Sequence, residues 1–230
     1  MSREDSAQNR DRTYAILGGI GMLTFAVLWE IRWQRLIRAF SQRDRSVEQW
    51  TERALHDPLT SMPNRTLLAD RIEQALIRAQ RQGTGVALLF IDLDDFKVVN
   101  DTYGHLVGDR LLIAAGERFR QHLRASDTAA RLGGDEFVVL LETRSPDDPV
   151  ELVAERLRRA LHVPLLLDPE PISLNASIGV IVSSSGTDSP DDMLDQADRA
   201  LIKAKQSGKD QIVIGPVDEP SVEFERRATV

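Results

Sequence analysis

The spacing of apolar residues divides most of the chain into alternating helical and extended segments. Positions three and four residues apart share one helix face, and this spacing predicts helices at 65–82, from after Gly108 to about Leu123, at about 148–161 and at 190–206. Short apolar runs bounded by turn residues predict strands at 86–91, 129–132, 137–141, about 172–182 and 211–214. This order, with one hairpin among the helices, predicts an α/β sandwich in which helices pack on a mixed sheet.

The hairpin is the most informative of these elements. Gly133 and Gly134 separate its two apolar runs, and glycine takes the positive φ of a tight turn without steric cost. Asp135 and Glu136 follow directly, so the hairpin would hold two carboxylates at its tip. Taken alone, a Gly-Gly-Asp-Glu run is also typical of an ordinary turn with solvated acids.

A third carboxylate, Asp92, ends the apolar run at 86–91, which is short and continuous enough to be a buried central strand. If this strand neighbours the hairpin, Asp92, Asp135 and Glu136 converge at one edge of the sheet. Clustered carboxylates repel one another unless a cation neutralises them, and hard oxygen ligands select Mg²⁺ or Mn²⁺. The pattern therefore predicts a metal site at this edge.

Residues 13–29 carry no charge and are bounded by Arg12 and Glu30. As a helix they would span roughly 25 Å, at the lower end of the lengths that cross a bilayer. The core of a signal peptide and a buried soluble helix are the alternatives, but no Ala-x-Ala-like cleavage site follows. We therefore expect a retained transmembrane helix. Arginines are more numerous after this segment than before it, which places the C-terminal domain in the cytoplasm.

The segments that flank this helix divide the rest of the chain. Residues 1–12 precede it as a tail, and residues 30–56 follow it as a linker helix. Apolar residues recur in the linker at 3-4 spacing, at Trp33, Leu36, Phe40, Val47, Trp50 and Ala54. This spacing predicts either a parallel coiled coil or an amphipathic helix lying on its own domain or on the membrane. Residues 215–230 are acidic, contain proline and lack periodicity, so we expect a disordered tail.

Composition narrows the functional classes. The net charge of −7 argues against a general nucleic-acid binder, and the 42% of apolar residues suffice for a buried core. The absence of cysteine excludes disulfides and thiolate metal sites, and it is compatible with a reducing cytosol.

Several spaced motifs carry a family resemblance. The chain reads Asp-Leu-Asp-Asp-Phe-Lys-Val-Val-Asn-Asp from Asp92 and Arg-Leu-Gly-Gly-Asp-Glu-Phe at 131–137, with Asp-Pro-Leu-Thr at 57–60 and Ala204-Lys205 near the end. Over roughly 57–214 it resembles the GGDEF family of diguanylate cyclases. The resemblance implies an α+β fold, a ferredoxin-like palm with a central mixed sheet, akin to nucleotide cyclases and polymerases. It also implies an enzyme that condenses two GTP into cyclic di-GMP and two pyrophosphates at a homodimer interface.

The resemblance assigns roles to the acidic residues. It implies that Asp92, the backbone carbonyl of Leu93, Asp135 and Glu136 bind two Mg²⁺ or Mn²⁺ ions, with Asp135 and Glu136 as the catalytic pair. Asp135 either accepts the proton of the attacking 3′-hydroxyl or holds the metal that acidifies it. With the predicted transmembrane helix, a single-pass protein of the bacterial inner (cytoplasmic) membrane is expected, with its catalytic domain in the cytoplasm.

The resemblance also assigns the substrate-binding residues. Asn100 and Asp109, flanking a loop with Gly104 and Gly108, would bind guanine, since a carboxylate can accept from both N1–H and the 2-amino group. His105 would either contact the nucleotide or pack at a helix start. Phosphate-binding positions are implied at Phe96, Lys97, Lys205 and Lys209, the first two in a turn whose backbone amides can cradle phosphate.

An Arg-x-x-Asp tetrad precedes the hairpin. Arg124 and Asp127 match the family's inhibitory site, where an arginine beside an acid suits binding of the product dinucleotide. Cyclic di-GMP is thus expected as both product and inhibitor. The rival hypothesis is a non-enzymatic module that senses cyclic di-GMP or GTP, against which the intact acidic residues argue. A purely structural membrane coiled-coil protein would leave the clustered acids unexplained.

Overall fold

The computed structural model describes residues 54–145, 148–165, 171–183 and 188–215, together with Trp29 and residues 32–34. Contacts divide the chain into two units, Met1–Ala54 and Leu55–Val230. Nearly all of the predicted membrane segment, most of the linker and nearly all of the C-terminal tail lie outside the described residues, so those predictions remain predictions. Within the ranges just given, none of the helices combines the length and apolar character needed to cross a membrane.

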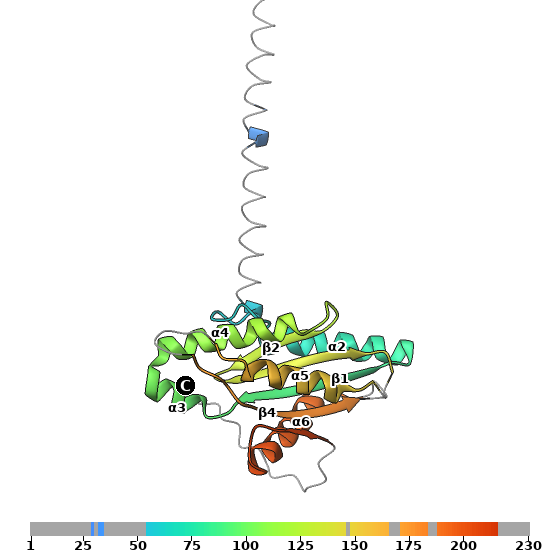
Figure 1. Cartoon of the computed structure of the whole chain (residues 1–230). Helices are drawn as coiled ribbons and strands as arrows, with labels where there is room; N and C mark the ends of the chain where they lie inside the picture. The colour runs from blue at the N-terminus through green and yellow to red at the C-terminus, as the bar shows by residue number, and fades with distance from the viewer. Residues whose placement is uncertain are drawn as a thin grey trace, which may run out of the picture. The chain divides into compact units, whose positions relative to one another are not determined.

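The second unit is built on a five-stranded sheet (Figure 1). Its strand order is β2-β3-β1-β4-β5, and the strands are β1 (Gly85–Leu93), β2 (Thr128–Gly133), β3 (Glu136–Thr143), β4 (Ala176–Ser183) and β5 (Ile212–Ile214). β4 and β5 pair in parallel, whereas every other neighbouring pair is antiparallel. The predicted mixed sheet and the predicted hairpin are therefore confirmed.

Five helices are described alongside this sheet: α2 (Arg65–Gln82), α3 (Phe96–Tyr103), α4 (His105–Gln121), α5 (Val150–His162) and α6 (Pro190–Gln206). α2 begins after Asn64, whose side chain accepts a hydrogen bond from the Leu67 amide. α6 begins after Ser189, which caps the Asp192 amide in the same way and is followed by a proline at the first helical position. The sequence predicts both of these helices at their observed bounds.

Two predictions of local structure were wrong. The segment between Asp92 and Gly108, expected as a turn and a loop, forms α3 and the first turn of α4, and Gly104 with φ 84° is the only residue between the two helices. The apolar face of α3 is small: Phe96 is its one fully buried residue, and Val99 and Tyr103 are only partly buried against the core. The strand expected from about residue 172 begins at Ala176, and Ile172 forms only an isolated bridge with Leu165.

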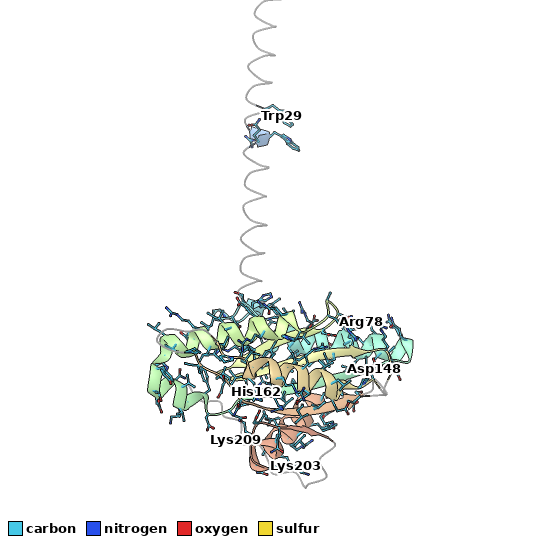
Figure 2. The ribbon with its side chains drawn as sticks, viewed as in Figure 1. Trp29, Arg78, Asp148, His162, Lys203 and Lys209 are labelled. Atoms are coloured by element: carbon cyan, nitrogen blue, oxygen red, sulfur yellow. The ribbon has the colours of Figure 1, made fainter. Side chains whose placement is uncertain are left out.

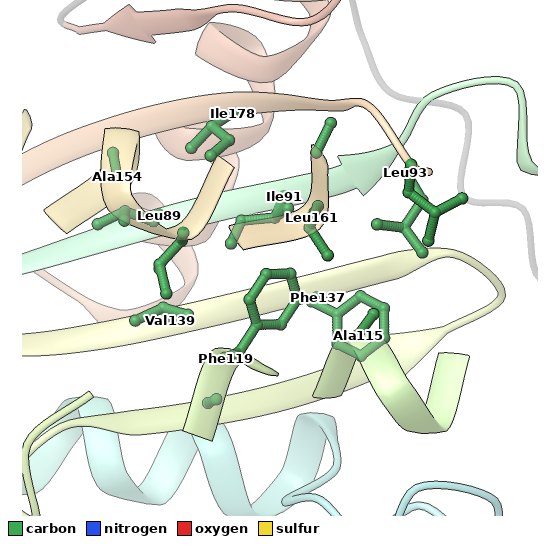
Figure 3. Packing of buried hydrophobic residues seen from close by; sticks show 14 of the residues in the cluster. Leu89, Ile91, Leu93, Ala115, Phe119, Phe137, Val139, Ala154, Leu161 and Ile178 are labelled. Carbon is green, nitrogen blue, oxygen red and sulfur yellow. The ribbon is translucent and has the colours of Figure 1, made fainter. Parts of the chain in front are cut away.

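The core lies on both faces of the sheet. All nine residues of β1 are buried, and alternate side chains enter different clusters. Leu89 and Ile91 pack with residues of α4 and α5 (Figure 3). In the same cluster, the ring of Phe119 from α4 meets the ring of Phe137 from β3 edge to face, with 5.3 Å between the ring centroids. Leu88 packs on the other face, with residues of α2 and α6. β1 is thus the central strand, and its last residues reach the middle of one sheet edge.

An ion pair joins the start of the domain to the hairpin. The guanidinium of Arg131 donates to both carboxylate oxygens of Asp57 at 2.9 and 3.0 Å, and to the carbonyl of Gly134 at 2.7 and 3.1 Å. The hydroxyl of Thr60 donates to the same carboxylate at 2.7 Å. These bonds, together with Arg131's charge, hold the pKa of Asp57 below 3.8, although burial acts in the opposite direction.

The bonds that Asp57 accepts from Thr60 and Arg131 should make stability depend on pH. Because the folded pKa of Asp57 is depressed, its contribution is fully present above pH 3.8 and is lost as pH falls through the folded pKa. We expect the difference in unfolding free energy between wild type and Asp57→Asn to be constant from about pH 6 to 5 and to shrink below the unfolded pKa. Urea denaturation across this range measures it. Asp70→Asn, at an exposed carboxylate, is the control. A difference in unfolding free energy that did not change with pH would contradict this explanation.

Candidate active site at the sheet edge

The hairpin turn lies beside the end of β1. Asp92 pairs in register with Glu136 of β3, and the Leu93 amide donates to the carbonyl of Asp135 at 3.3 Å. The turn is tight, and Gly134 has φ 51°, a left-handed value that glycine adopts without cost. The structure thus confirms that the two strands are neighbours and that the three acidic residues meet at one edge.

Burial and mutual repulsion disfavour negative charge at this edge. Asp92 is only 6% exposed, and burial followed by the charge of Asp135 raises its pKa, although Lys205 acts in the opposite direction. Burial raises the pKa of Glu136 as well, followed by the charges of Asp92 and of Asp198 on α6. A cation placed at this edge would relieve the repulsion.

Lys205 supplies a positive charge to this edge. Its Nζ lies 2.6 Å from Oδ2 of Asp92, so Lys205 forms a salt bridge with that carboxylate. In the described part of the chain, no three His, Asp or Glu side chains form a group that could hold a metal ion. The two strands therefore meet as predicted, but the described acidic side chains do not form a group of three that could hold a metal ion. The donor chemistry still fits a hard divalent cation, because carboxylates whose charge is disfavoured stand side by side.

Three contacts join the end of β1 and the acidic turn after it to the end of α6 and the turn after that helix. Besides the Lys205–Asp92 pair, Lys209 Nζ donates to Asp95 Oδ1 at 2.7 Å, and the Asp210 amide donates to Asp94 Oδ2 at 2.9 Å. Asp94 is buried and accepts a further bond from the Ser177 hydroxyl at 2.8 Å. Lys205 and Lys209, two of the residues predicted to bind phosphate, are therefore brought to the carboxylate edge.

Sequence reasoning gave no role to three residues that shape this edge: Asp94, Arg131 and Asp210. A signal was available for two of them. Asp94 follows Asp92 by two residues, so it lies on the same side of an extended segment. Arg131 is a charged residue within an otherwise apolar strand, and a buried charge requires a partner. No comparable pattern marks Asp210.

One predicted guanine-binding residue, Asn100, lies where α3 packs on α4, next to the residue that precedes the other, Asp109. A β-carbon placed on Gly108 would lie 1.9 Å from Oδ1 of Asn100, so the amide side chain rests on the backbone that leads into Asp109. His105 is the first residue of α4 and is exposed, so the alternative that it packs at a helix start is not supported.

The side chain of Phe96 is 7% exposed and belongs to the core. Only its backbone could therefore face a phosphate. Phe96 and the exposed Lys97 do not form the predicted loop turn but begin α3. The first amides of a helix lack intrahelical partners, so this helix start still directs unbonded amides outward.

The predicted inhibitory residues lie in the loop before β2. The Arg124 amide donates to Oδ2 of Asp127 at 2.9 Å. Both residues line a cavity of about 280 Å³, to which Arg144 and Arg156 also contribute. β2 runs from residue 128 to residue 133, so this loop and the hairpin turn lie at opposite ends of the strand. The two predicted sites are therefore separate.

Comparisons with known proteins agree with this architecture. The family model described as diguanylate cyclase, GGDEF domain, matches residues 54–211, and the chain therefore belongs to the GGDEF family.

Among curated proteins of Pseudomonas aeruginosa, the chain is 47% identical over 156 residues to the bifunctional diguanylate cyclase/cyclic di-GMP phosphodiesterase MucR, covering 68% of this chain and 23% of that protein. It is 42% identical over 170 residues to the diguanylate cyclase DgcP, covering 73% and 25%. The chain thus spans about a quarter of the length of these relatives.

Solved structures give the same picture. The GGDEF domain of TpbB (YfiN) from Pseudomonas aeruginosa matches with a TM-score of 0.66 at 35% identity, covering 69% of this chain and 99% of that one. The coiled coil and GGDEF domain of DgcB from Caulobacter crescentus, in complex with cyclic di-GMP, matches with a TM-score of 0.74 at 25% identity, covering 81% and 98%.

Proposed function

We propose that this chain is a diguanylate cyclase, which joins two GTP molecules into cyclic di-GMP and releases two pyrophosphates. The observation that carries the proposal is the pairing of Asp92 with Glu136 beside the Gly134-Asp135 turn, with Lys205 in contact at the same edge. Names of relatives support it: MucR and DgcP are both called diguanylate cyclases.

Different residues of the chain would bind the guanine base and the triphosphate. Asn100 and Asp109 would read the guanine, because a carboxylate can accept from N1–H and the 2-amino group together. Lys205, Lys209, Lys97 and the free amides at the start of α3 would bind the triphosphate, which leaves the α-phosphorus near the carboxylate edge.

The reaction forms two phosphodiester bonds. In each half, a 3′-hydroxyl oxygen attacks the α-phosphorus of the other GTP, the proton leaves that hydroxyl, and pyrophosphate departs with the electrons of the broken bond. Asp135, in the turn of the hairpin, would either receive this proton or hold the cation that acidifies the hydroxyl.

A divalent cation belongs to this proposal. Mg²⁺ or Mn²⁺ held by Asp92, the Leu93 carbonyl, Asp135 and Glu136 would acidify the hydroxyl and stabilise charge on the phosphoryl group and the pyrophosphate. Chelation with EDTA should abolish product formation, and added Mg²⁺ should restore it; activity that persists in EDTA would contradict a metal requirement.

The product also implies a second copy of the chain. Each domain binds one GTP in this proposal, so two domains must face each other, and a membrane anchor with a linker coil would raise their local concentration. Deleting residues 1–56 should release the chain from the membrane fraction and make activity per molecule depend steeply on concentration. A deleted chain that stays membrane-bound, or whose activity ignores concentration, would contradict this organisation.

The direct test of the activity is simple. The full chain is incubated with GTP and Mg²⁺, and cyclic di-GMP and pyrophosphate are measured by mass spectrometry and an enzymatic assay. Product in a 1:2 ratio is expected from the reaction. Binding of GTP or cyclic di-GMP without turnover would instead favour a sensing module.

The loop at the other end of β2 should mediate product inhibition. Cyclic di-GMP carries two phosphates, and Arg124 beside Asp127 in a cavity lined by further arginines suits such a ligand. We expect Arg124→Ala to raise the inhibitory concentration of cyclic di-GMP by at least about tenfold while the basal rate stays unchanged, because the two sites are separate. Initial rates at increasing cyclic di-GMP measure this. Arg81→Ala, at an exposed arginine on α2, is the control. If the inhibition curves of Arg124→Ala and wild type coincided, the assignment of a regulatory site to Arg124 would be wrong.

A further inference from the structure

The turn that carries Lys209 has an unusual backbone. Lys209 and Asp210 both adopt left-handed conformations, with φ 62° and 45°, directly after Gly208 with φ 119°. Residues other than glycine pay a steric cost in this region, and two in succession persist only where surrounding contacts hold them. Asp95, the partner of Lys209, is itself left-handed with φ 56°.

Contacts from two directions hold this turn. From the turn after β1, Asp94 accepts the Asp210 amide. From α5, Arg158 Nη1 donates to Asp210 Oδ1 at 2.7 Å and to its backbone carbonyl at 3.2 Å, and Nε2 of His162 lies 2.9 Å from the same Oδ1. Figure 2 labels His162 of α5 and Lys209 of this turn. Asp210 is thus bound through its amide, its carbonyl and its carboxylate.

Arg158 is itself fixed in place. Its other two nitrogens form a fork onto the carboxylate of Glu155, at 2.9 and 3.1 Å, and its side chain is 17% exposed. Such bidentate pairing orders a guanidinium and restricts its rotamers. The pairing lowers the pKa of Glu155 to about 2, so the fork stays charged at neutral pH.

We propose that Arg158 is a positioning residue for nucleotide phosphate: it holds Asp210, and thereby the left-handed turn, where Lys209 reaches Asp95 beside the carboxylate edge. The inference rests on the proposed function in taking a nucleoside triphosphate as the ligand. Arg158 contacts the turn and not the reacting atoms. Its loss would let the turn relax toward ordinary backbone angles and carry the ammonium group of Lys209 away from the phosphates. The guanine contacts of α3 and α4 involve neither Arg158 nor Asp210, so they should be unaffected.

The experiment separates phosphate binding from base binding in the full chain. Arg158→Gln is compared with wild type for binding of 3′-deoxy-GTP, which lacks the attacking hydroxyl and cannot react, and of 3′-deoxy-GMP, which lacks the β- and γ-phosphates. We expect the dissociation constant for the triphosphate to rise by about tenfold and that for the monophosphate to change less than about twofold. In turnover, KM for GTP should rise while kcat at saturation changes little.

Arg159→Gln is the matched control. Arg159 also pairs with Glu155, but its side chain is 75% exposed, and it makes no described contact with Asp210. It should therefore bind both nucleotides as wild type does. If Arg158→Gln does not fold, Asp210→Asn makes the same test, since asparagine tolerates the left-handed backbone and only the charge is lost.

If binding of both nucleotides weakened equally, Arg158 would have a general structural role. If binding of both were unchanged, Arg158 would have no role in binding. Either result would overturn the proposal. Binding is measured apart from turnover. A chain that binds GTP in this pattern but makes no cyclic di-GMP would therefore contradict the proposed function and leave this inference standing.

Discussion

Replacing Asp135 by alanine should lower the rate of cyclic di-GMP formation by about a thousandfold or more. Asp135 lies in the hairpin turn beside Asp92, and its negative charge adds to the burial that raises the pKa of that carboxylate. Removing it deletes the group proposed to receive the proton and to share the cation. The side chain is partly exposed and the residue has no left-handed backbone, so alanine should be accommodated without loss of the fold. Product measured by mass spectrometry, at saturating GTP and Mg²⁺, gives the rate.

The control for this variant is Asp101→Ala, an exposed aspartate on α3 outside the carboxylate edge. It should retain turnover close to that of wild type. Thermal unfolding of both variants shows whether the fold survives. A well-folded Asp135→Ala enzyme with near-wild-type turnover would sink the catalytic assignment.

The meeting of β1 and the hairpin could be predicted because each element has a strong local signal. A continuous apolar run such as 86–91 has no polar face, so it must be buried on both sides of a sheet. The Gly133-Gly134 pair fixes a turn through backbone sterics alone. The resemblance to a known family singles out Asn100 and Asp109, and in the structure Asn100 packs against Gly108, the residue before Asp109.

α3 was missed because its apolar face is short and lies between two glycines. Phe96 is its one fully buried residue, Val99 and Tyr103 are only partly buried, and Val98 is 59% exposed. Its close packing on α4 depends on the missing side chain of Gly108. In sequence, however, Gly104 and Gly108 indicate a loop, because isolated glycines destabilise helices when no tertiary contact compensates.

The network around Asp210 was hidden for a different reason. Its partners Asp94 and Arg158 lie 116 and 52 residues away in the chain. Polar side chains that meet across such separations leave no periodicity, since neither helix nor strand spacing relates them. Only the three-dimensional arrangement shows that the α6–β5 turn is clamped between β1 and α5.

The second large effect is expected at Gly179 in β4, which pairs with Phe90 on the central strand. A β-carbon there would lie 2.2 Å from the Ala197 carbonyl oxygen and 2.3 Å from the Leu201 amide nitrogen. Both are backbone atoms of α6, so no side-chain rotation can relieve the clash, and the whole helix must shift. We expect Gly179→Ala to lower the free energy of unfolding by at least about 3 kcal/mol, a large share of the ~5–15 kcal/mol of a typical domain.

Gly116→Ala provides the matched comparison, because it adds the same methyl group at another buried glycine. Its β-carbon would lie 2.6 Å from the sulfur of Met62, a flexible side chain that can move, and alanine adds helix propensity within α4. Its free energy of unfolding should stay within about 1 kcal/mol of wild type. Urea denaturation of the full chain measures both variants. Since α6 also carries Lys205, any folded Gly179→Ala protein should bind GTP more weakly, whereas Gly116→Ala should not. Equal stabilities for the two variants would show that α6 yields easily and that β4 does not fix its position.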